Sequence, residues 1–233
     1  MRIPSYTMRH KIRKALVQRF HAETSTFHLS CREYVILSLD WTAILGIRFG
    51  GYLILTDDIS FEMACELLGI PLPLTTDTKG YFRPIASPQI RTEWLKGSIP
   101  WSVVPTDIHL RRFFMYSLGS CFFGNNRSVL SCQLLWAIRV VSDVGRYDWG
   151  SITYEFFISF LRQASQQDFR SLEGCWQILA WWTYEYIPAL RTWFSGFLAT
   201  VYPRAYAWFL CTITGVVLVG VYAVKSNLIV CHK

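Results

Sequence analysis

Residues 143–161 read DVGRYDWGSITYEFFISFL, a turn rich in glycine that leads into an apolar helix. Gly145 and Gly150 permit a tight turn, because glycine accepts backbone conformations that other residues avoid. Asp148 or Ser151 can cap the first turn of the helix by accepting a backbone N–H. One face of the helix is apolar, and its members are Ile152, Phe156, Phe157, Phe160 and Leu161. The stretch therefore predicts a helix that is buried on one side and begins at a structural turn.

Helical periodicity extends over most of the chain. The predicted helices are 8–20, 40–49, 57–68, 106–123, 130–143, 151–165 and 172–187. Two runs rich in β-branched and aromatic residues, TFHL at 26–29 and YVILSL at 34–39, predict a hairpin. Residues 71–92 hold four prolines and predict a long loop. The pattern indicates a mainly α fold, in which a single multi-helical domain carries a small N-terminal β-hairpin.

The C-terminal part contains an apolar run at residues 205–224, which has no charged side chain. We expect an apolar helix here, and its 20 residues match the length that crosses a bilayer core of about 30 Å. Three interpretations are open: a single-pass C-terminal membrane anchor, a buried terminal helix of the domain, and a tail that is foreign to the domain.

Two features are candidates for contact with nucleic acid. The formal net charge is +7, and residues 1–20 supply six of these charges without an acidic residue, which leaves +1 for the rest. The basic segment can attract nucleic acid, a nuclear import receptor or anionic lipid, although a solvated helix face explains it as well. Its candidate contact residues are Arg9, Lys11, Arg13, Lys14 and Arg19. Trp176, Trp181 and Trp182 could stack on bases, but their helical spacing favours core packing.

The chain carries no familiar motif of catalysis or cofactor binding. It has no glycine-rich nucleotide loop and no G-x-S-x-G nucleophile turn. Its seven cysteines include no C-x-x-C pair and its five histidines no H-x-x-x-H pair. Asp57 and Asp58 are adjacent, which suits helix capping better than paired acid–base catalysis. We therefore expect no catalytic, cofactor-binding or metal-binding residues.

Six blocks of sequence, in a fixed order, carry a family resemblance. They are ALVQRFHAETSTFHLSCREYVILSLDWTAILGIRFGG, CELLGIP, LKGS, RRFFMYSLGSCFF, VGRYDWGSITYEFFISFLRQAS, and EGCWQILAWWTYEYIP with YPRAYAW. Together they resemble the plant mobile domain, also described as aminotransferase-like. This domain is typical of the MAINTENANCE OF MERISTEMS-like and serine/threonine phosphatase 7 long form homolog-like family.

The resemblance implies a division of the chain into a basic N-terminal segment (1–14), a plant mobile domain (15–208) and a non-family apolar tail (209–233). It implies a nuclear protein that acts in meristem maintenance and transposon silencing, or a copy derived from a transposable element. A membrane protein anchored through 205–224 is the alternative. The residues of the family signature to which we assign a structural role are Gly145, Arg146, Tyr147, Trp149 and Gly150.

The family's names also suggest enzymatic activity, which the residues do not support. A pyridoxal-phosphate enzyme needs a lysine beside a phosphate cup, and Lys79 and Lys96 lack such surroundings in the sequence. The G-D-x-H-G pattern of metallophosphatases is missing as well. The expected protein is thus not an enzyme and needs no cofactor. It acts through protein partners, among them a phosphatase-like protein of the same family.

Overall fold

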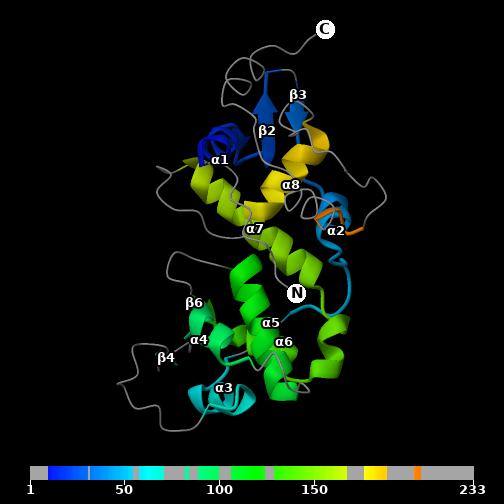
Figure 1. Cartoon of the computed structure of the whole chain (residues 1–233). Coiled ribbons are helices and arrows are strands. Elements are labelled where there is room, and N and C mark those ends of the chain that lie inside the picture. The colour runs from blue at the N-terminus through cyan, green and yellow to red at the C-terminus, as the bar shows by residue number, and fades with distance from the viewer. Residues whose placement is uncertain are drawn as a thin grey trace, which may run out of the picture. The chain divides into compact units, whose positions relative to one another are not determined.

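The computed structural model describes residues 10–30, 32–54, 58–70, 82–83, 89–99, 106–123, 129–166, 176–187 and 202–205 (Figure 1). The chain forms two compact units. Unit 1 comprises residues 1–49, 157–170 and 175–233, and unit 2 comprises residues 50–156 and 171–174.

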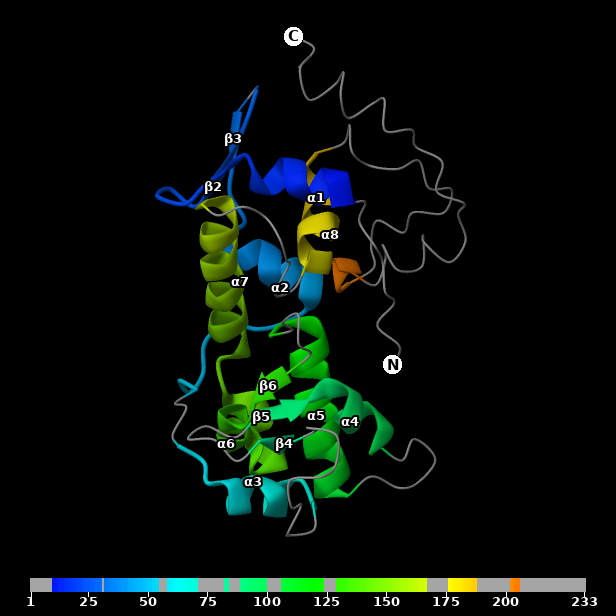
Figure 2. The same ribbon diagram turned by 90° about the vertical axis from the view of Figure 1, so that its left-hand side faces the viewer.

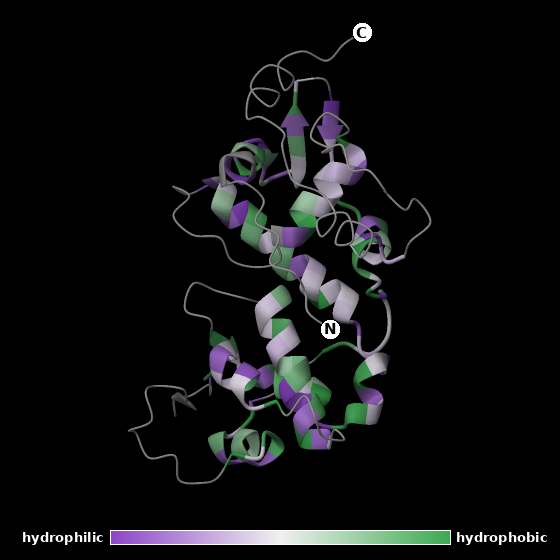
Figure 3. Cartoon of the chain, viewed as in Figure 1, coloured by the Kyte–Doolittle hydropathy of each residue, from purple (hydrophilic) through white to green (hydrophobic). Residues whose placement is uncertain are grey.

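Unit 1 combines a three-stranded antiparallel sheet with helices. Its elements are α1 (His10–Val17), β1 (Phe20–His21), β2 (Thr26–Leu29), β3 (Arg32–Tyr34), α2 (Ser38–Leu45), the second half of α7 (Trp149–Gln166) and α8 (Trp176–Tyr186) (Figures 1 and 2). Strand β2 lies in the centre of the sheet and pairs Phe27 with Phe20 on β1 and with Tyr34 on β3. Alternation along the strands therefore places these three aromatic residues on one face. Strand β3 is mostly hydrophilic (Figure 3).

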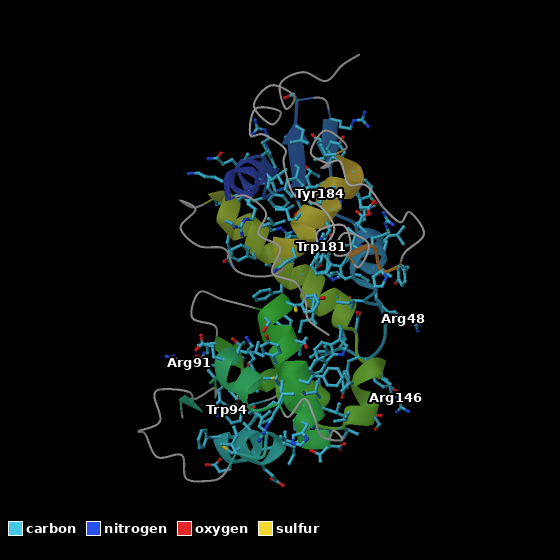
Figure 4. All side chains as sticks on the ribbon, viewed as in Figure 1. Arg48, Arg91, Trp94, Arg146, Trp181 and Tyr184 are labelled. Atoms are coloured by element: carbon cyan, nitrogen blue, oxygen red, sulfur yellow. The ribbon has the colours of Figure 1, made fainter. Side chains whose placement is uncertain are left out.

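Aromatic side chains fill the core of unit 1. The ring of Phe27 lies 5.0 Å from that of Phe20 and 5.3 Å from that of Trp182 on α8. Trp41 on α2 packs on Phe157 of α7 at 5.3 Å. Such pairs stabilise a fold beyond the area that they bury. The tryptophans of α8 accordingly serve the core: Trp181 and Trp182 are buried, as their spacing predicted, and the side chain of Trp176 lies outside the described part (Figure 4).

Unit 2 is built around the long helix α5. Its elements are α3 (Phe61–Leu67), β4 (Phe82–Arg83), β5 (Gln89–Arg91), α4 (Thr92–Gly97), α5 (Asp107–Cys121), β6 (Val129–Ser131), the 3-10 helix η1 (Cys132–Leu134), α6 (Leu135–Ile138), the 3-10 helix η2 (Val141–Arg146) and the first half of α7. Strands β4, β5 and β6 form an antiparallel sheet in that order. Met115 of α5, Ile90 of β5 and Leu135 of α6 are fully buried in one apolar cluster. Gly119 lets α5 approach α4 closely, because a Cβ there would lie 2.5 Å from Thr92 Cγ2.

The predicted mainly helical fold with a small N-terminal β element is confirmed. Helices α1, α3, α5 and α8 lie within predicted helices, and α7 extends its predicted range slightly at both ends. The chain divides into two compact units, which hydrophobic periodicity could not reveal because unit 1 draws on segments far apart in sequence.

Three local predictions differ from the structure. The run at 34–39 gives only Tyr34 to a strand, because the Asp40 carboxylate accepts the Leu37 N–H at 2.8 Å and α2 begins at Ser38. The predicted helix 130–143 is divided among β6, η1, α6 and η2, since its first residues pair with β5. The predicted loop 71–92 contains strands β4 and β5.

The predicted C-terminal apolar helix at 205–224 lies outside the described residues, except for Ala205. Over the described ranges, no helix has the length and apolar character that a membrane span requires.

Candidate functional site

The predicted basic contact residues divide between the surface and the packed side of α1. Lys14 is exposed, whereas Arg13 and Arg19 are half-buried. Arg13 shares the helix face of the buried Leu16 and Val17, three and four residues further on. Its Nε is buried without a hydrogen-bond partner among the described residues, and desolvation lowers the pKa of this guanidinium. Arg13 is therefore a packing residue more than a free surface cation.

The remaining members of the basic set are described only in part. Lys11 precedes Lys14 by three residues on α1, so helix geometry places the two positions on the same face. The side chain of Lys11 and the whole of Arg9 lie outside the described part of the chain. Arg19 donates from Nη1 to the Ala15 carbonyl at 3.3 Å. Among the side chains of this set that the structure describes, Lys14 is the exposed one, and Arg13 and Arg19 are half-buried.

The turn at 143–151 is held by side-chain hydrogen bonds. Asp148 caps α7, since its carboxylate accepts the Ser151 N–H at 2.9 Å and the Ser151 hydroxyl at 2.7 Å. Burial raises the pKa of the Asp148 carboxyl, but hydrogen bonds from Ser151 and from the Gly50 N–H outweigh it, and the net pKa is lowered. Trp149 Nε1 donates to the Val144 carbonyl at 2.8 Å. These contacts confirm the predicted cap and give Trp149 a structural role.

A second segment completes the turn. Tyr52 N–H donates to the Arg146 carbonyl at 2.8 Å, and Asp148 N–H donates to the Tyr52 carbonyl at 2.9 Å, which forms a parallel bridge between Tyr52 and Tyr147. Gly51 has φ +123, and a Cβ there would lie 2.4 Å from the Arg146 oxygen. A glycine is therefore required at position 51 for this close approach.

The glycines of the turn itself have a different role from the one predicted. Gly145 and Gly150 do not adopt positive φ, and Gly150 lies inside α7, so the conformational freedom is needed at Gly51 instead. Arg146 points outward from η2 and pairs with Asp143 at 3.3 Å (Figure 4). This ion pair is exposed and contributes little to stability.

Arg112 of α5 binds the carboxyl end of α3, a role that the sequence analysis missed. Its guanidinium donates to the carbonyls of Leu68 at 2.8 Å, Gly69 at 3.1 Å and Ser98 at 2.9 Å. It also lies over the ring of Trp94, 5.3 Å from the ring centre. The last carbonyls of a helix have no partner within the helix, so Arg112 satisfies groups that α3 leaves open.

Arg111 extends this contact on the neighbouring position. It donates to the Leu67 carbonyl at 3.4 Å and to the Arg139 carbonyl at 3.0 Å, and it pairs with Asp107 at 3.6 Å. We call Arg111 and Arg112 the arginine clamp. The clamp joins α3, α4 and α6 to α5 through backbone carbonyls.

A buried carboxylate organises the helices of unit 1. Asp40 is only 6% exposed and accepts three hydrogen bonds: from the Leu37 N–H, from Trp182 Nε1 at 3.3 Å and from the Tyr186 hydroxyl. Burial, the bond to Asp40 and the nearby negative charges raise the pKa of Tyr186 to about 12. Because each donor comes from α8 or from the start of α2, Asp40 ties these two helices together.

The segment that follows α8 is fixed to the same region. Arg204 Nε donates to Glu185 at 2.8 Å, and both side chains are largely buried. A Cβ on Gly46, at the end of α2, would lie 2.8 Å from Pro203 Cγ. Residues 202–204 are thus packed against α2 and α8.

Two cysteines of unit 2 have strongly raised thiol pKa values. Desolvation raises the pKa of Cys121 and of Cys132 to about 12, which makes both thiols poor nucleophiles. Across the described ranges, no cluster of three or more His, Cys, Asp or Glu side chains has a metal-binding arrangement.

A comparison with known families identifies the family of this chain. A family profile described as Plant mobile domain matches residues 1–215. The chain belongs to the plant mobile domain family. The match includes residues 1–14 and 209–215, which lie beyond the predicted domain limits of 15–208.

Several curated plant mobile domain relatives are from Arabidopsis thaliana. Protein MAINTENANCE OF MERISTEMS is 28% identical over 192 residues, which cover 78% of this chain and 38% of the relative. Protein MAIN-LIKE 1 is 26% identical over 195 residues, with 78% of this chain and 37% of the relative covered. Serine/threonine-protein phosphatase 7 long form homolog is 26% identical over 181 residues, or 73% of this chain and 13% of the relative. The chain therefore spans less than two-fifths of the length of these relatives. No solved structure matches the chain.

The blocks that carry the family resemblance coincide with these structural contacts. In unit 2, the clamp arginines begin the RRFF block, and their acceptors lie at the CELLGIP and LKGS blocks. In unit 1, Asp40, Trp182 and Arg204 come from the first block, the EGCWQILAWWTYEYIP block and the YPRAYAW block. Several residues of these blocks therefore make packing and capping contacts in this chain.

Proposed function

We propose that this plant mobile domain is a non-enzymatic nuclear module that acts by binding macromolecules in meristem maintenance and transposon silencing. Three relatives of this chain bear names from the meristem-maintenance group, which supports the biological setting. Several residues of the six sequence blocks cap helices or hold them together. This structural use supports a binding role over a catalytic one.

The observation that carries the binding role is the outer face of α1. Lys14 is exposed there, and Lys11 occupies the same face. The described residues of unit 1 hold eight Lys and Arg against four Asp and Glu, whereas those of unit 2 hold seven against eight. The positive excess lies in the unit that carries α1, which suits attraction to a nucleic-acid backbone or to an acidic import receptor.

A charge-reversal experiment tests this face. Lys11→Glu with Lys14→Glu reverses the charge at two positions on one face of α1 and leaves the packing residue Arg13 in place. The expected result is loss of nuclear accumulation of a fluorescent fusion, or loss of nucleic-acid retention by purified protein. If each lysine neutralises one phosphate, the slope of log K against log salt concentration for DNA binding becomes shallower by roughly 2.

Lys96→Glu with Arg146→Glu (the Lys96 variant) is the matched control, because both side chains are exposed in unit 2 and two residues are reversed, as in the α1 variant. Equal behaviour of the α1 variant and of wild type in both assays refutes the role of α1. An equal loss in the Lys96 variant attributes the effect to net charge alone.

The same proposal includes protein partners, among them a phosphatase-like protein of the same family, because one relative bears a phosphatase name. Affinity purification from nuclei with and without nuclease separates the two kinds of partner. A partner that survives nuclease treatment is bound through protein, and one that is lost is bridged by nucleic acid. Recovery of no nuclear partner in either case refutes the binding module.

A further inference from the structure

The outer face of the sheet in unit 1 carries two stacked histidines. Phe20 and Phe27 are buried in the core, so alternation along β1 and β2 turns the next residues, His21 and His28, to the opposite face. Their ring centroids lie 3.6 Å apart, with an angle of 12° between the ring planes. His21 is exposed, so solvent reaches the part of its ring that His28 does not cover.

Hydrogen bonds connect the two histidines to the turn between β1 and β2. His28 Nε2 is hydrogen-bonded to Thr26 Oγ1 at 3.0 Å, and Thr26 Oγ1 is hydrogen-bonded to Thr24 Oγ1 at 2.7 Å. The Ser25 N–H donates to the His21 carbonyl at 2.8 Å in the same turn. The imidazole rings and the hydroxyl side chains of the turn are therefore in continuous contact.

A cation from α7 lies at the end of this surface. Arg162 is exposed, and its guanidinium donates to the Ser25 hydroxyl from Nε at 3.0 Å and from Nη2 at 2.8 Å. Figure 2 shows the end of α7 beside β2. A guanidinium has five N–H donors, so these two bonds position the side chain and leave donors for a further acceptor. We call His21, Thr26, His28 and Arg162 the histidine face.

Acidic side chains limit the positive charge of the histidine face. Glu33 is the partner of His28 across β2 and β3, and its carboxylate lies 3.3 Å from His28 Nε2. Glu23 is exposed in the adjoining turn. Because these two carboxylates offset the charge of Arg162, general attraction to phosphates is weak at this surface. A ligand here gains its affinity from the exposed ring and the hydroxyls, and Arg162 can bind a single anionic group.

We propose that the histidine face binds single-stranded nucleic acid, with a base stacked on the exposed ring of His21 and a neighbouring phosphate bound by Arg162. The bases of a single strand are accessible, and histidine rings are among the side chains on which they stack. The exposed Thr24 hydroxyl supplies a donor and an acceptor for the edge of the base or for a sugar. Duplex bases are stacked on one another and offer no free face to His21. This second surface rests on the proposed binding of nucleic acid and differs from the outer face of α1 in its preference for single strands.

Fluorescence anisotropy of the full chain with a labelled oligonucleotide of about ten nucleotides, as a single strand and as a duplex, tests this preference. His21→Ala should weaken binding of the single strand about 5- to 10-fold at fixed salt and leave duplex affinity unchanged. His21→Phe keeps a stacking platform and should retain the wild-type affinity within about twofold. The matched control is Tyr52→Ala, which removes an aromatic side chain of unit 2 that is 63% exposed and should change neither affinity.

Arg162→Gln tests the phosphate contact. The slope of log K against log salt concentration for the single strand should become shallower by about 0.7, the share of one phosphate. Arg146→Gln is the control, because it removes an exposed cation of unit 2, and it should leave the slope unchanged. Should His21→Ala lose the circular dichroism of wild type, the slope of the Arg162 variant decides in its place.

Several outcomes overturn the proposal. An unchanged affinity in His21→Ala, an equal loss for single strand and duplex, an equal loss in Tyr52→Ala, or no recovery in His21→Phe shows that no base stacks on His21. An unchanged salt slope in Arg162→Gln excludes the phosphate contact. Loss of a nuclease-resistant nuclear partner in His21→Ala, with oligonucleotide affinity unchanged, identifies a protein ligand of this face instead.

The same assay separates this surface from the proposed function. If Lys11→Glu with Lys14→Glu weakens binding of both oligonucleotides and the His21 and Arg162 variants do not, nucleic acid is bound at α1 and the histidine face has no part in it. If the wild-type chain binds neither oligonucleotide, the proposed nucleic-acid binding fails together with the histidine face.

Discussion

Replacing Arg112 with methionine tests whether the arginine clamp stabilises unit 2. Methionine keeps the length and apolar stem of the side chain but removes the guanidinium, which donates to three backbone carbonyls. The carbonyls of Leu68 and Ser98 then lose a partner in a partly buried site. The stacking contact with Trp94 is lost in the same variant.

The expected loss can be worked from these contacts. Hydrogen bonds to a charged group contribute about 1.5–3 kcal/mol each, but their values are not additive. The Gly69 contact is exposed and water can replace it, so the two part-buried contacts dominate. We expect the free energy of unfolding to fall by about 2–4 kcal/mol. At roughly 2–4 °C per kcal/mol for a chain of this size, Tm falls by about 5–15 °C.

Urea unfolding followed by circular dichroism, together with hydrogen exchange of α3, measures the effect. Arg139→Met is the control, because Arg139 is exposed and its guanidinium lies over the Trp136 ring at 3.9 Å rather than at the end of α3. Its expected cost is about 0.5–1 kcal/mol. If Arg112→Met costs no more than the control, and α3 keeps its exchange protection, the clamp does not stabilise unit 2.

Three further substitutions test other contacts. Gly51→Ala forces a Cβ against the Arg146 oxygen at positive φ and should lower the free energy of unfolding by more than about 1 kcal/mol. Gly97→Ala is the control, because a Cβ there meets open space in a helix, and it should be neutral or stabilising. Equal thermal midpoints of the two variants contradict this expectation. Asp148→Ala removes the cap of α7 and should cost about 1 kcal/mol near pH 7. Because the pKa of Asp148 is lowered on folding, that difference should shrink as the pH falls below the unfolded value of 3.8, and a difference that persists in acid argues against the cap. The pKa of Tyr186 is raised from 10.0 to about 12, so its stabilising bond to Asp40 is fully present below pH 10 and is lost between pH 10 and 12. Tyr186→Phe should therefore flatten the fall in the free energy of unfolding over this pH range. An unchanged fall excludes Tyr186 as its source.

Local signals in the sequence were sufficient for helices α1, α3, α5, α7 and α8 and for the cap of α7. Two of these features depend only on short spacings along the chain: the apolar face of 151–165 and the bond between Asp148 and Ser151. Residues one or two helical turns apart are placed by the spacing alone. The same is true of TFHL, which forms β2. Strands β5 and β6 were missed because their pairing joins Gln89 to Ser131 across 42 residues.

Side-chain contacts between distant segments could not be predicted from periodicity. Arg112 reaches Leu68 across 44 residues and Tyr186 reaches Asp40 across 146. The sequence did hold an indirect signal, because these residues lie in or beside the blocks that resemble the plant mobile domain. For Arg13, charge alone predicts a contact residue, and the structure adds that it is half-buried on the helix face of Leu16 and Val17.

The dependence of α3 on the arginine clamp has a consequence for the order of folding. Helix α3 has seven residues, fewer than an isolated helix needs to persist in water. The partners of its last carbonyls lie on α5, more than forty residues later. We expect α5 to form first and α3 to consolidate late, with low φ-values at Ala64 and Cys65. During synthesis, therefore, α3 remains exposed to proteases until residue 112 has left the ribosome.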